Sequence, residues 1–383
     1  MCHFRATLVS LTFCLLLSLP AAAQPVYYNT SSSTPANNTL HSVATDGAND
    51  TILFTANGSV SRCTAMAVDA LDGKLFLVDA QSNAIWGVNL SGTSAVLIKS
   101  GLTSFPTDLA LDVLNQRIYF TTSSTIQGNN TVQVINYDGT GAATLFAATG
   151  SSGNGVSRCT ALALDPSHSK LFLADAGAQR IWSMSLTGSG LTALAATTNC
   201  FPIGLAVNPS NQQVYFTASS ALQTSNFIQR VNYDGSGLTT LFTAAGGVQR
   251  CTALDLDLTH SSIYLSDAGA GALWRIPLAG GSAVSVVSGL SATAKRVRWY
   301  GGPNSRPAPG ITSIRLSGTD VLLSATNGFI GGTYYVLTST NVATPLNQWQ
   351  PVSTNVLSAS GSFTLTNTLG SALPQEFYIL GVQ

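Results

Sequence analysis

The chain has 383 residues, of which 45% are hydrophobic and only 8% are charged, and its 16 basic residues balance its 16 acidic ones. This length suffices for two or three domains with buried cores. The neutral balance argues against a nucleic-acid-binding surface, which needs an excess of cations to neutralise phosphates. A single Glu, Glu376, stands among 35 Gly and many Ser, Thr and Asn residues. This composition disfavours a helical protein and predicts an all-β fold.

Residues 1–23 have the pattern of a signal peptide. Arg5 supplies the positive start, an apolar stretch runs from Leu8 to Leu19, and Ala21-Ala22-Ala23 forms a small-residue cleavage site. The apolar stretch is shorter than the ~20 residues that span a membrane. We therefore expect an exported chain that begins near Gln24, has no membrane span, and is secreted, periplasmic or held at the cell surface.

Internal repetition is the strongest signal in the chain. The motif Arg-Cys-Thr-Ala occurs three times, with its arginines at Arg62, Arg158 and Arg250. Each copy is followed, at constant spacing, by two Asp residues and one Trp: Asp69, Asp79 and Trp86; Asp165, Asp175 and Trp182; Asp257, Asp267 and Trp274. Constant spacing in every copy indicates a repeated structural unit.

A second kind of unit lies between these copies. It runs from Phe105-Pro106 to the segment VINYDGTG, and again from Phe201-Pro202 to RVNYDGSG. Every unit holds four short alternating runs separated by Gly, Asn or Ser turns, the pattern of a four-stranded propeller blade. The N-terminal stretch from Val26 lacks only an innermost strand, which the late segment around Val297 supplies. We therefore predict a six-bladed β-propeller over residues 24–300, closed by pairing of its N- and C-terminal strands.

The second kind of unit resembles the YWTD repeats of six-bladed propellers of the low-density-lipoprotein-receptor type, and it is also similar to NHL-like propellers. The resemblance rests on Tyr119-Phe120-Thr121-Thr122, on its copy Tyr215-Phe216-Thr217-Ala218, and on the Asp-Gly turns that follow. The first kind of unit has Phe76-Leu77-Val78-Asp79 at this place. The resemblance covers about residues 25–300 and implies a closed six-bladed fold. Propellers of these families include binding modules as well as metal-dependent lactonases and lyases.

The C-terminal part differs in pattern from the repeats. Residues 301–310 are rich in Pro and Gly and are expected to form a linker. About six alternating runs follow within residues 311–383 and predict a small β-sandwich. The segment TYYVLTSTNVATPLNQWQPVSTN looks like the C-terminal β-modules of exported bacterial proteins. We expect either a passive accessory domain or a module for attachment, sorting or glycan contact.

The residues repeated in every copy of the first unit are interpreted as scaffold. A carboxylate at the end of a strand accepts backbone N–H groups of the next turn, the role expected of the six repeated Asp residues. The three repeated Trp residues are expected to pack between blades. Alternate blades hold Cys63, Cys159 and Cys251 too far apart for a disulfide or a zinc site. Cys200, in contrast, could pair with Cys159 or Cys251 of a neighbouring blade.

Charged residues near the propeller axis are the candidates for a ligand site. The inner-strand position of Ala67 stays Ala in the next three units, then becomes Asp255 and Arg298. We predict an ion pair between these two, because an unpaired buried charge is costly. The position of Ala65 becomes Asp108 in the second blade and Arg296 in the sixth.

Together these charges predict a mildly cationic channel mouth that binds a carboxylate or a phosphate. The cations assigned to it are Lys295, Arg296 and Arg298 with Arg62, Arg158 and Arg250 at the entrances to inner strands. The alternative is a set of salt bridges between blades without any ligand.

Signals for catalysis are sparse. No catalytic, zinc or nucleotide-binding motif is present, and we predict no catalytic residue, metal or cofactor. A calcium-type site in the channel would use Glu, Asn and Asp; the single Glu lies outside the propeller, although Asp108, Asp255 and Asn208 offer oxygen ligands.

The sequence favours an exported, non-enzymatic, monomeric binding propeller whose partner is a protein, a glycan or a small anionic ligand. A metal-dependent lactonase, lyase or esterase and a structural component of the cell envelope are the alternatives.

Overall fold

The computed structural model describes residues 25–32, 34–69, 72–90, 95–113, 115–149, 155–290, 293–299, 310–317, 320–326, 333–341, 344, 348–356, 363–368 and 377–382. The chain divides into two compact units, one formed by Ala23–Ser305 and the other containing Arg306–Gln383. In the described residues, helix is limited to short 3-10 turns: η1 (Pro35–Asn37), η2 (Gln127–Asn129), η3 (Pro166–His168) and η4 (Gln223–Ser225). None of the helices described is long and apolar enough to cross a membrane.

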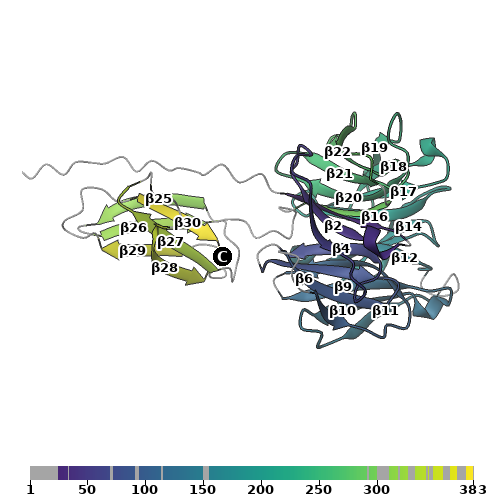
Figure 1. Ribbon diagram of the computed structural model, residues 1–383, viewed down its shortest axis with the longest axis horizontal. Coiled ribbons are helices and arrows are strands. Elements are labelled where there is room, and N and C mark those ends of the chain that lie inside the picture. Colours follow the sequence, from purple (N-terminus) through teal and green to yellow (C-terminus); the bar gives the residue numbers. More distant parts are fainter. Residues whose placement is uncertain are drawn as a thin grey trace, which may run out of the picture. The chain divides into compact units, whose positions relative to one another are not determined.

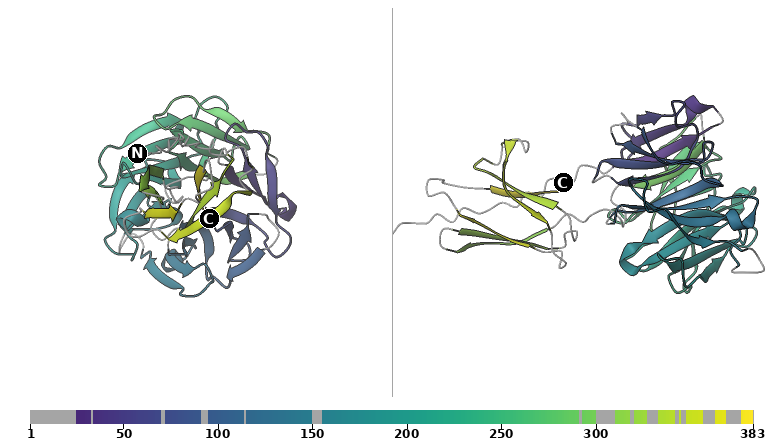
Figure 2. Two further views of the ribbon diagram at one scale, coloured as in Figure 1. Left: turned by 90° about the vertical axis from the view of Figure 1, so that its left-hand side faces the viewer. Right: turned by 90° about the horizontal axis from the view of Figure 1, so that it is seen from below.

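The larger unit is a ring of six four-stranded antiparallel sheets, the blades of a β-propeller (Figure 1, Figure 2). Blades 1, 3 and 5, the odd blades, carry the Arg-Cys-Thr-Ala motif. Their strands are β4 (Cys63–Asp69), β5 (Lys74–Asp79), β6 (Ala84–Asn89) and β7 (Ala95–Lys99); β12 (Cys159–Asp165), β13 (Lys170–Asp175), β14 (Arg180–Ser185) and β15 (Thr192–Ala196); β20 (Cys251–Asp257), β21 (Ser262–Asp267), β22 (Ala272–Pro277) and β23 (Val284–Val287).

Blades 2, 4 and 6 are the even blades. Their strands are β8 (Phe105–Asp112), β9 (Arg117–Ser123), β10 (Thr131–Asn136) and β11 (Ala143–Ala147); β16 (Phe201–Asn208), β17 (Gln213–Ser219), β18 (Phe227–Asn232) and β19 (Thr239–Thr243); β24 (Thr293–Trp299), β1 (Val26–Ser31), β2 (Thr39–Val43) and β3 (Thr51–Thr55). The second strand of a blade is buried on both faces, as in β5, whereas the outermost strand, such as β7, is partly exposed and has no buried residue. Continuous apolar runs therefore mark the middle of each blade.

Blade 6 combines strands from both ends of the unit. Its strand order is β24-β1-β2-β3, and Tyr28 of β1 lies opposite Val297 of β24. The pairing occupies the inner edge of β1 with backbone hydrogen bonds, so that this edge is not open to another chain.

The hydrophobic core consists of clusters that lie between neighbouring blades. One contains Phe76 of blade 1 and Phe120 of blade 2. Blade 6 shares one cluster with blade 1, which includes Met66, and another with blade 5, which includes Tyr28 and Tyr264. The packing is therefore continuous around the ring. Apolar burial contributes about 25 cal/mol per Å², so these contacts between blades are the main source of stability.

The turn between the third and fourth strands of a blade touches the outer strand of the preceding blade. Gly139 has φ +84°, and a Cβ added there would lie 2.4 Å from the carbonyl oxygen of Ile98 in β7. Glycine is therefore required both by the left-handed backbone and by the close approach. The same kind of turn in other blades places Gly47, Gly188, Gly235 and Gly280 against a carbonyl of the blade before.

The smaller unit contains two three-stranded antiparallel sheets, in the orders β25-β26-β29 and β28-β27-β30. Leu323 and Val336 are fully buried, one from each sheet, and the indole N–H of Trp349 donates to the carbonyl of Thr344 at 2.8 Å. The β-sandwich expected for this part of the chain stays a prediction. Their strands are β25 (Gly310–Ser317), β26 (Asp320–Thr326), β27 (Thr333–Ser339), β28 (Gln350–Val356), β29 (Phe363–Thr368) and β30 (Phe377–Val382).

Candidate functional site

The inner strand of each blade gives the propeller two distinct faces. We call the face at which inner strands begin the entrance face; its residues include Arg62, Phe105, Arg158, Phe201 and Arg250, at or just before the start of a strand. The opposite end is the exit face. Val26 pairs with Trp299, so β1 begins and β24 ends at the exit face, and the entrance face is free of both chain ends of the ring.

On the entrance face of each odd blade, a buried carboxylate bridges two loops. Asp175 accepts four backbone N–H groups at 2.8–2.9 Å, two from the loop that contains Arg158 and two from the turn after β13. Asp79 and Asp267 accept the four corresponding N–H groups in blades 1 and 5. These bridging Asp residues fix the backbone from which the entrance arginines project.

The entrance arginines themselves are exposed. Within the described residues, no carboxylate forms an ion pair with Arg62, Arg158 or Arg250. The Nε of Arg250 donates to the hydroxyl of Ser219 at 3.3 Å. Three guanidinium groups therefore stand on a fixed backbone with their charge directed at solvent.

In the even blades, a buried asparagine holds the loop between the second and third strands. The sequence did not reveal this feature. The amide nitrogen of Asn130 donates to the carbonyls of Ser124 and Ile126 at 3.1 and 3.3 Å, and its oxygen accepts the N–H of Ser124 at 3.1 Å. Asn38 and Asn226 make the equivalent contacts in blades 6 and 4. The available signal was an Asn at the same place in all three even units.

The loops of blades 2 and 4 present large apolar side chains on the entrance face. Phe105 and Phe201 are 58% and 48% exposed, and Ile126 and Leu222, at the tips of the Asn-bridged loops, are 64% and 67% exposed. Apolar side chains of this size are seldom exposed in groups unless they contact a partner. Cations on odd blades thus alternate with apolar side chains on these two even blades.

On the exit face, the other repeated carboxylates connect neighbouring blades. Asp165 accepts the N–H of His168 at 3.2 Å and the hydroxyl of Tyr233, from blade 4, at 2.9 Å. Tyr137 of blade 2 donates to Asp69 at 3.2 Å. Burial opposes ionisation of Asp165, but hydrogen bonds from Ser167, His168 and Tyr233 outweigh it and lower its pKa. Asp257 similarly accepts the N–H of His260 at 2.8 Å.

The three repeated tryptophans pack between blades. Trp182 belongs to the cluster between blades 2 and 3, and its indole N–H donates to Asp175 at 3.3 Å. Trp86 packs on the cluster shared with blade 6, and Trp274 on the cluster shared with blade 4. Their rings therefore stabilise the ring of blades.

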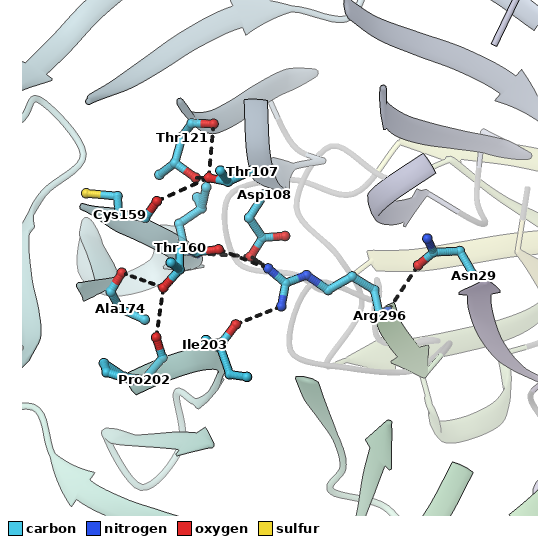
Figure 3. A network of polar contacts seen from close by, with 11 residues as sticks. Asn29, Thr107, Asp108, Thr121, Cys159, Thr160, Ala174, Pro202, Ile203 and Arg296 are labelled. Atoms are coloured by element: carbon cyan, nitrogen blue, oxygen red, sulfur yellow. Dashed lines mark hydrogen bonds and ion pairs between the residues drawn. The ribbon is translucent and has the colours of Figure 1, made fainter. Parts of the chain in front are cut away.

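Arg296 spans the channel near the entrance face (Figure 3). From blade 6, its guanidinium contacts Asp108 of blade 2 at 3.1 Å and donates to the carbonyls of Thr160 in blade 3 at 3.1 Å and Ile203 in blade 4 at 2.9 Å. Its backbone N–H donates to Asn29 at 3.1 Å. The Asp108 and Arg296 side chains are only 2% and 7% exposed, so this buried pair joins distant blades across the axis.

The predicted axial site is therefore only partly assembled in the described structure. Asp108 and Arg296 neutralise each other, while Asp255 is half-buried on β20 and accepts the N–H of Leu256 at 3.0 Å. The side chains of Lys295 and Arg298 lie outside the described residues, and the Asp255–Arg298 pair stays a prediction.

The cysteines are buried free thiols. Cys63, Cys159, Cys200 and Cys251 form no disulfide, so Cys200 is not paired with either neighbour, and its thiol donates to the carbonyl of Ser225 at 3.1 Å. Burial raises the pKa of Cys63 and Cys251 to about 12. Over the described part of the chain, no group of three His, Cys, Asp or Glu side chains is arranged to hold a metal ion.

Blade 6 contains a polar network that the other even blades lack. Tyr28 donates to Asp50 at 2.6 Å, while the Nδ1 of His41 contacts Asp50 at 3.0 Å and its Nε2 contacts Thr39 at 2.7 Å. Blade 2 has Phe120, Gln133 and Ala142 at the places of Tyr28, His41 and Asp50. These coordinated differences from the repeat were the missed signal.

Comparisons with known proteins identify the fold. No protein-family model matches the chain, and no curated protein does. A chain in the crystal structure of a nidogen/laminin complex aligns with a TM-score of 0.60 and 15% identity over 72% of this chain and 97% of its own length. TolB from Acinetobacter baumannii aligns with a TM-score of 0.55 and 12% identity over 72% of this chain and 66% of TolB.

Identities this low establish the fold alone. They confirm the architecture expected from the YWTD-like repeats: the larger unit of this all-β chain is a β-propeller, similar in fold to those of nidogen and TolB.

Proposed function

We propose that this chain is an exported, non-enzymatic propeller that binds a partner protein on its entrance face. The observation that carries the proposal is the alternation around this face of exposed arginines, Arg62, Arg158 and Arg250, with exposed apolar side chains such as Phe105 and Phe201. Aromatic residues and Arg are enriched at protein interfaces and supply most of their binding energy.

The rigidity of the face supports this proposal. The bridging Asp and Asn residues hold the loops before a partner arrives, so that binding orders little backbone and costs less conformational entropy. The buried Asp108–Arg296 pair, at 3.1 Å, uses these two axial charges on each other. This favours contact across the face over entry into the channel. A propeller of similar fold occurs in a nidogen/laminin complex, and the signal-peptide pattern of residues 1–23 supports export.

Site-specific photo-crosslinking in the cells that make the protein tests this proposal. Benzoylphenylalanine replaces Phe105 or Phe201 on the entrance face, and Val96 on the outer strand β7 serves as control because its exposure, 60%, matches the 58% of Phe105. We expect one protein to be captured from both entrance positions and not from Val96.

The captured protein is then purified for a direct binding measurement. Its affinity for the chain should fall at least tenfold with Phe201→Asp and stay unchanged with Val96→Asp. Equal capture from all three positions, or none from the entrance face, would overturn the proposal.

A further inference from the structure

We propose that the cavity between blades 4 and 5 on the entrance face binds an acidic residue flanked by apolar side chains in an extended peptide segment of the partner. The inference rests on the proposed function and assigns a chemistry to one part of the face. The cavity has a volume of about 660 Å³ and is lined by Phe201, Ser219, Ser220, Gln223 and Arg250, among others.

Arg250 supplies the charge that recognises the carboxylate. Its Nε donates to Ser219 at 3.3 Å, which orients the guanidinium. Among the described residues, its two terminal nitrogens have no such partner and are available to a ligand. A pair of parallel N–H donors is the geometry that binds a carboxylate through both oxygens. Within the described residues, no acidic side chain pairs with Arg250, so the ligand's carboxylate would be its counterion.

The walls of the cavity are held in place. The amide nitrogen of Gln223 donates to the carbonyls of Gly246 and Val248 at 3.2 and 2.6 Å, which ties the η4 loop of blade 4 to the loop that leads into blade 5. Asp267 accepts the backbone N–H of Arg250 at 2.9 Å from the other side. A site fixed on both sides needs little ordering when it binds.

Phe201, which also lines the cavity, explains the preference for an apolar neighbour. Phe201, 48% exposed, stands beside a guanidinium on a rigid face, so a ligand with a carboxylate next to an aliphatic side chain satisfies both groups. The cavity is open to the entrance face, where Leu222 extends the apolar surface. An extended peptide can reach both, which favours a protein segment over a small free acid.

Arg62 provides a matched control within the same chain. It is exposed at the same place in blade 1, and its backbone N–H is held by Asp79 as that of Arg250 is held by Asp267. The preceding blade has Thr293 where blade 4 has Phe201. Arg62→Gln therefore removes the same charge from the same face without altering the proposed site.

The test uses the full chain with 4-fluorophenylalanine at position 201, so that the fluorine chemical shift reports on this cavity alone. The probe is the peptide Ac-Leu-Asp-Leu-NH2. We expect saturable binding of the Asp peptide that is at least tenfold weaker for Ac-Leu-Asn-Leu-NH2 and for Arg250→Gln, and unchanged by Arg62→Gln. Tenfold corresponds to about 1.4 kcal/mol, which the loss of a charge-assisted hydrogen bond reaches. Equal binding of the Asp and Asn peptides, or no shift, would overturn the inference.

A second arm uses 4-methylpentanoate, which has the carboxylate and the aliphatic group but no peptide. Binding as tight as that of the peptide would assign the cavity to small organic acids and overturn the peptide assignment. The two proposals fail separately. Crosslinking from the entrance face with no response to the Asp peptide rejects the cavity alone, whereas a specific peptide response with no crosslinked partner rejects the proposed function.

Discussion

The odd and even blades of this propeller solve one structural problem with different chemistry. Both must fix the turn that follows the second strand, and the odd blades do so with a carboxylate that accepts four N–H groups, as Asp175 does. The even blades use an amide that both donates and accepts, as Asn130 does. The comparison shows that a repeat can keep one structural role, fixing this turn, while changing the group that performs it.

The largest effect should come from removing a bridging carboxylate. Asp175→Ala leaves several buried N–H groups without an acceptor, each at a cost of about 1–3 kcal/mol, so the free energy of unfolding should fall by about 5 kcal/mol or more. Urea denaturation measures the change. Asp138→Ala, in an exposed turn, is the control. Similar losses for both variants would contradict the bridging role.

Arg296 connects odd and even blades, because its guanidinium contacts blades of both kinds. Arg296→Met leaves Asp108 buried without its partner and should lower the free energy of unfolding by about 3–5 kcal/mol. The double variant Arg296→Met/Asp108→Leu should recover much of this loss in the same urea measurement. A double variant as unstable as the single one would show that the pair's charges are not what matters.

Exchanging the two bridging groups sharpens the comparison directly. In Asp175→Asn, an NH2 group replaces the oxygen that accepts from N–H donors. In Asn130→Asp, an oxygen replaces the NH2 group that donates to the carbonyls of Ser124 and Ile126. We expect each exchange to destabilise the protein by about 2 kcal/mol or more, measured by thermal and urea unfolding. If neither exchange lowered the free energy of unfolding, side-chain shape alone, and not the direction of hydrogen bonding, would distinguish the blades.

Alkaline pH should act first on the odd blades, which alone begin their inner strands with cysteine. Burial raises the pKa of Cys63 from 9.0 to about 12, so the folded state retains a proton that the unfolded chain releases above pH 9. This contribution to stability is therefore complete well below pH 9 and falls as the pH rises toward 12, by about 1.4 kcal/mol per thiol at pH 10. Cys63→Ala/Cys251→Ala should flatten the pH dependence of the urea midpoint between pH 9 and 10; an unchanged slope would contradict this account.

The exposed apolar residues of the even blades should matter least for stability. Phe201→Ser changes a side chain that is 48% exposed, and the free energy of unfolding should change by less than about 0.5 kcal/mol. If circular dichroism and urea unfolding showed a large loss, Phe201 would belong to the scaffold, and its place on the binding face would need another explanation.

Much of the fold could be predicted because each blade repeats the sequence pattern of its neighbours. The repeat located the inner strands: the Arg-Cys-Thr-Ala motifs lie where β4, β12 and β20 begin, and the stretch at Val26 lies beside the strand at Val297. The same alignment identified Asp108 and Arg296 as unusual residues at the axis.

Alignment could not show that Asp108 and Arg296 pair with each other. The sequence favoured ion pairs between charges on adjacent blades. An Arg side chain is long enough to reach across the axis, however, and Arg296 of blade 6 contacts blades 2, 3 and 4. Alignment of the repeats shows in which blade a residue lies and at which position of the strand. The direction of a long side chain depends instead on which hydrogen-bonding groups across the axis still need a partner.

The Asn bridges and the His41 network were missed for opposite reasons. Asn is common in turns, so Asn130 does not stand out from the surrounding Ser, Thr and Asn residues. His41 carries no signal by itself, because the network becomes visible only when Tyr28, His41 and Asp50 are compared together with the Phe, Gln and Ala at these places in blade 2.

The pairing of strands from both ends of the unit in blade 6 has a consequence for synthesis on the ribosome. A chain made from its N-terminus displays β1 long before β24 exists, so the nascent protein carries an unpaired strand edge until residue 299 has emerged. Blade 6, and with it the ring, becomes complete only after the last strand has been released. Premature termination would therefore yield not a smaller propeller but an open one, with an edge ready to pair with a second nascent chain.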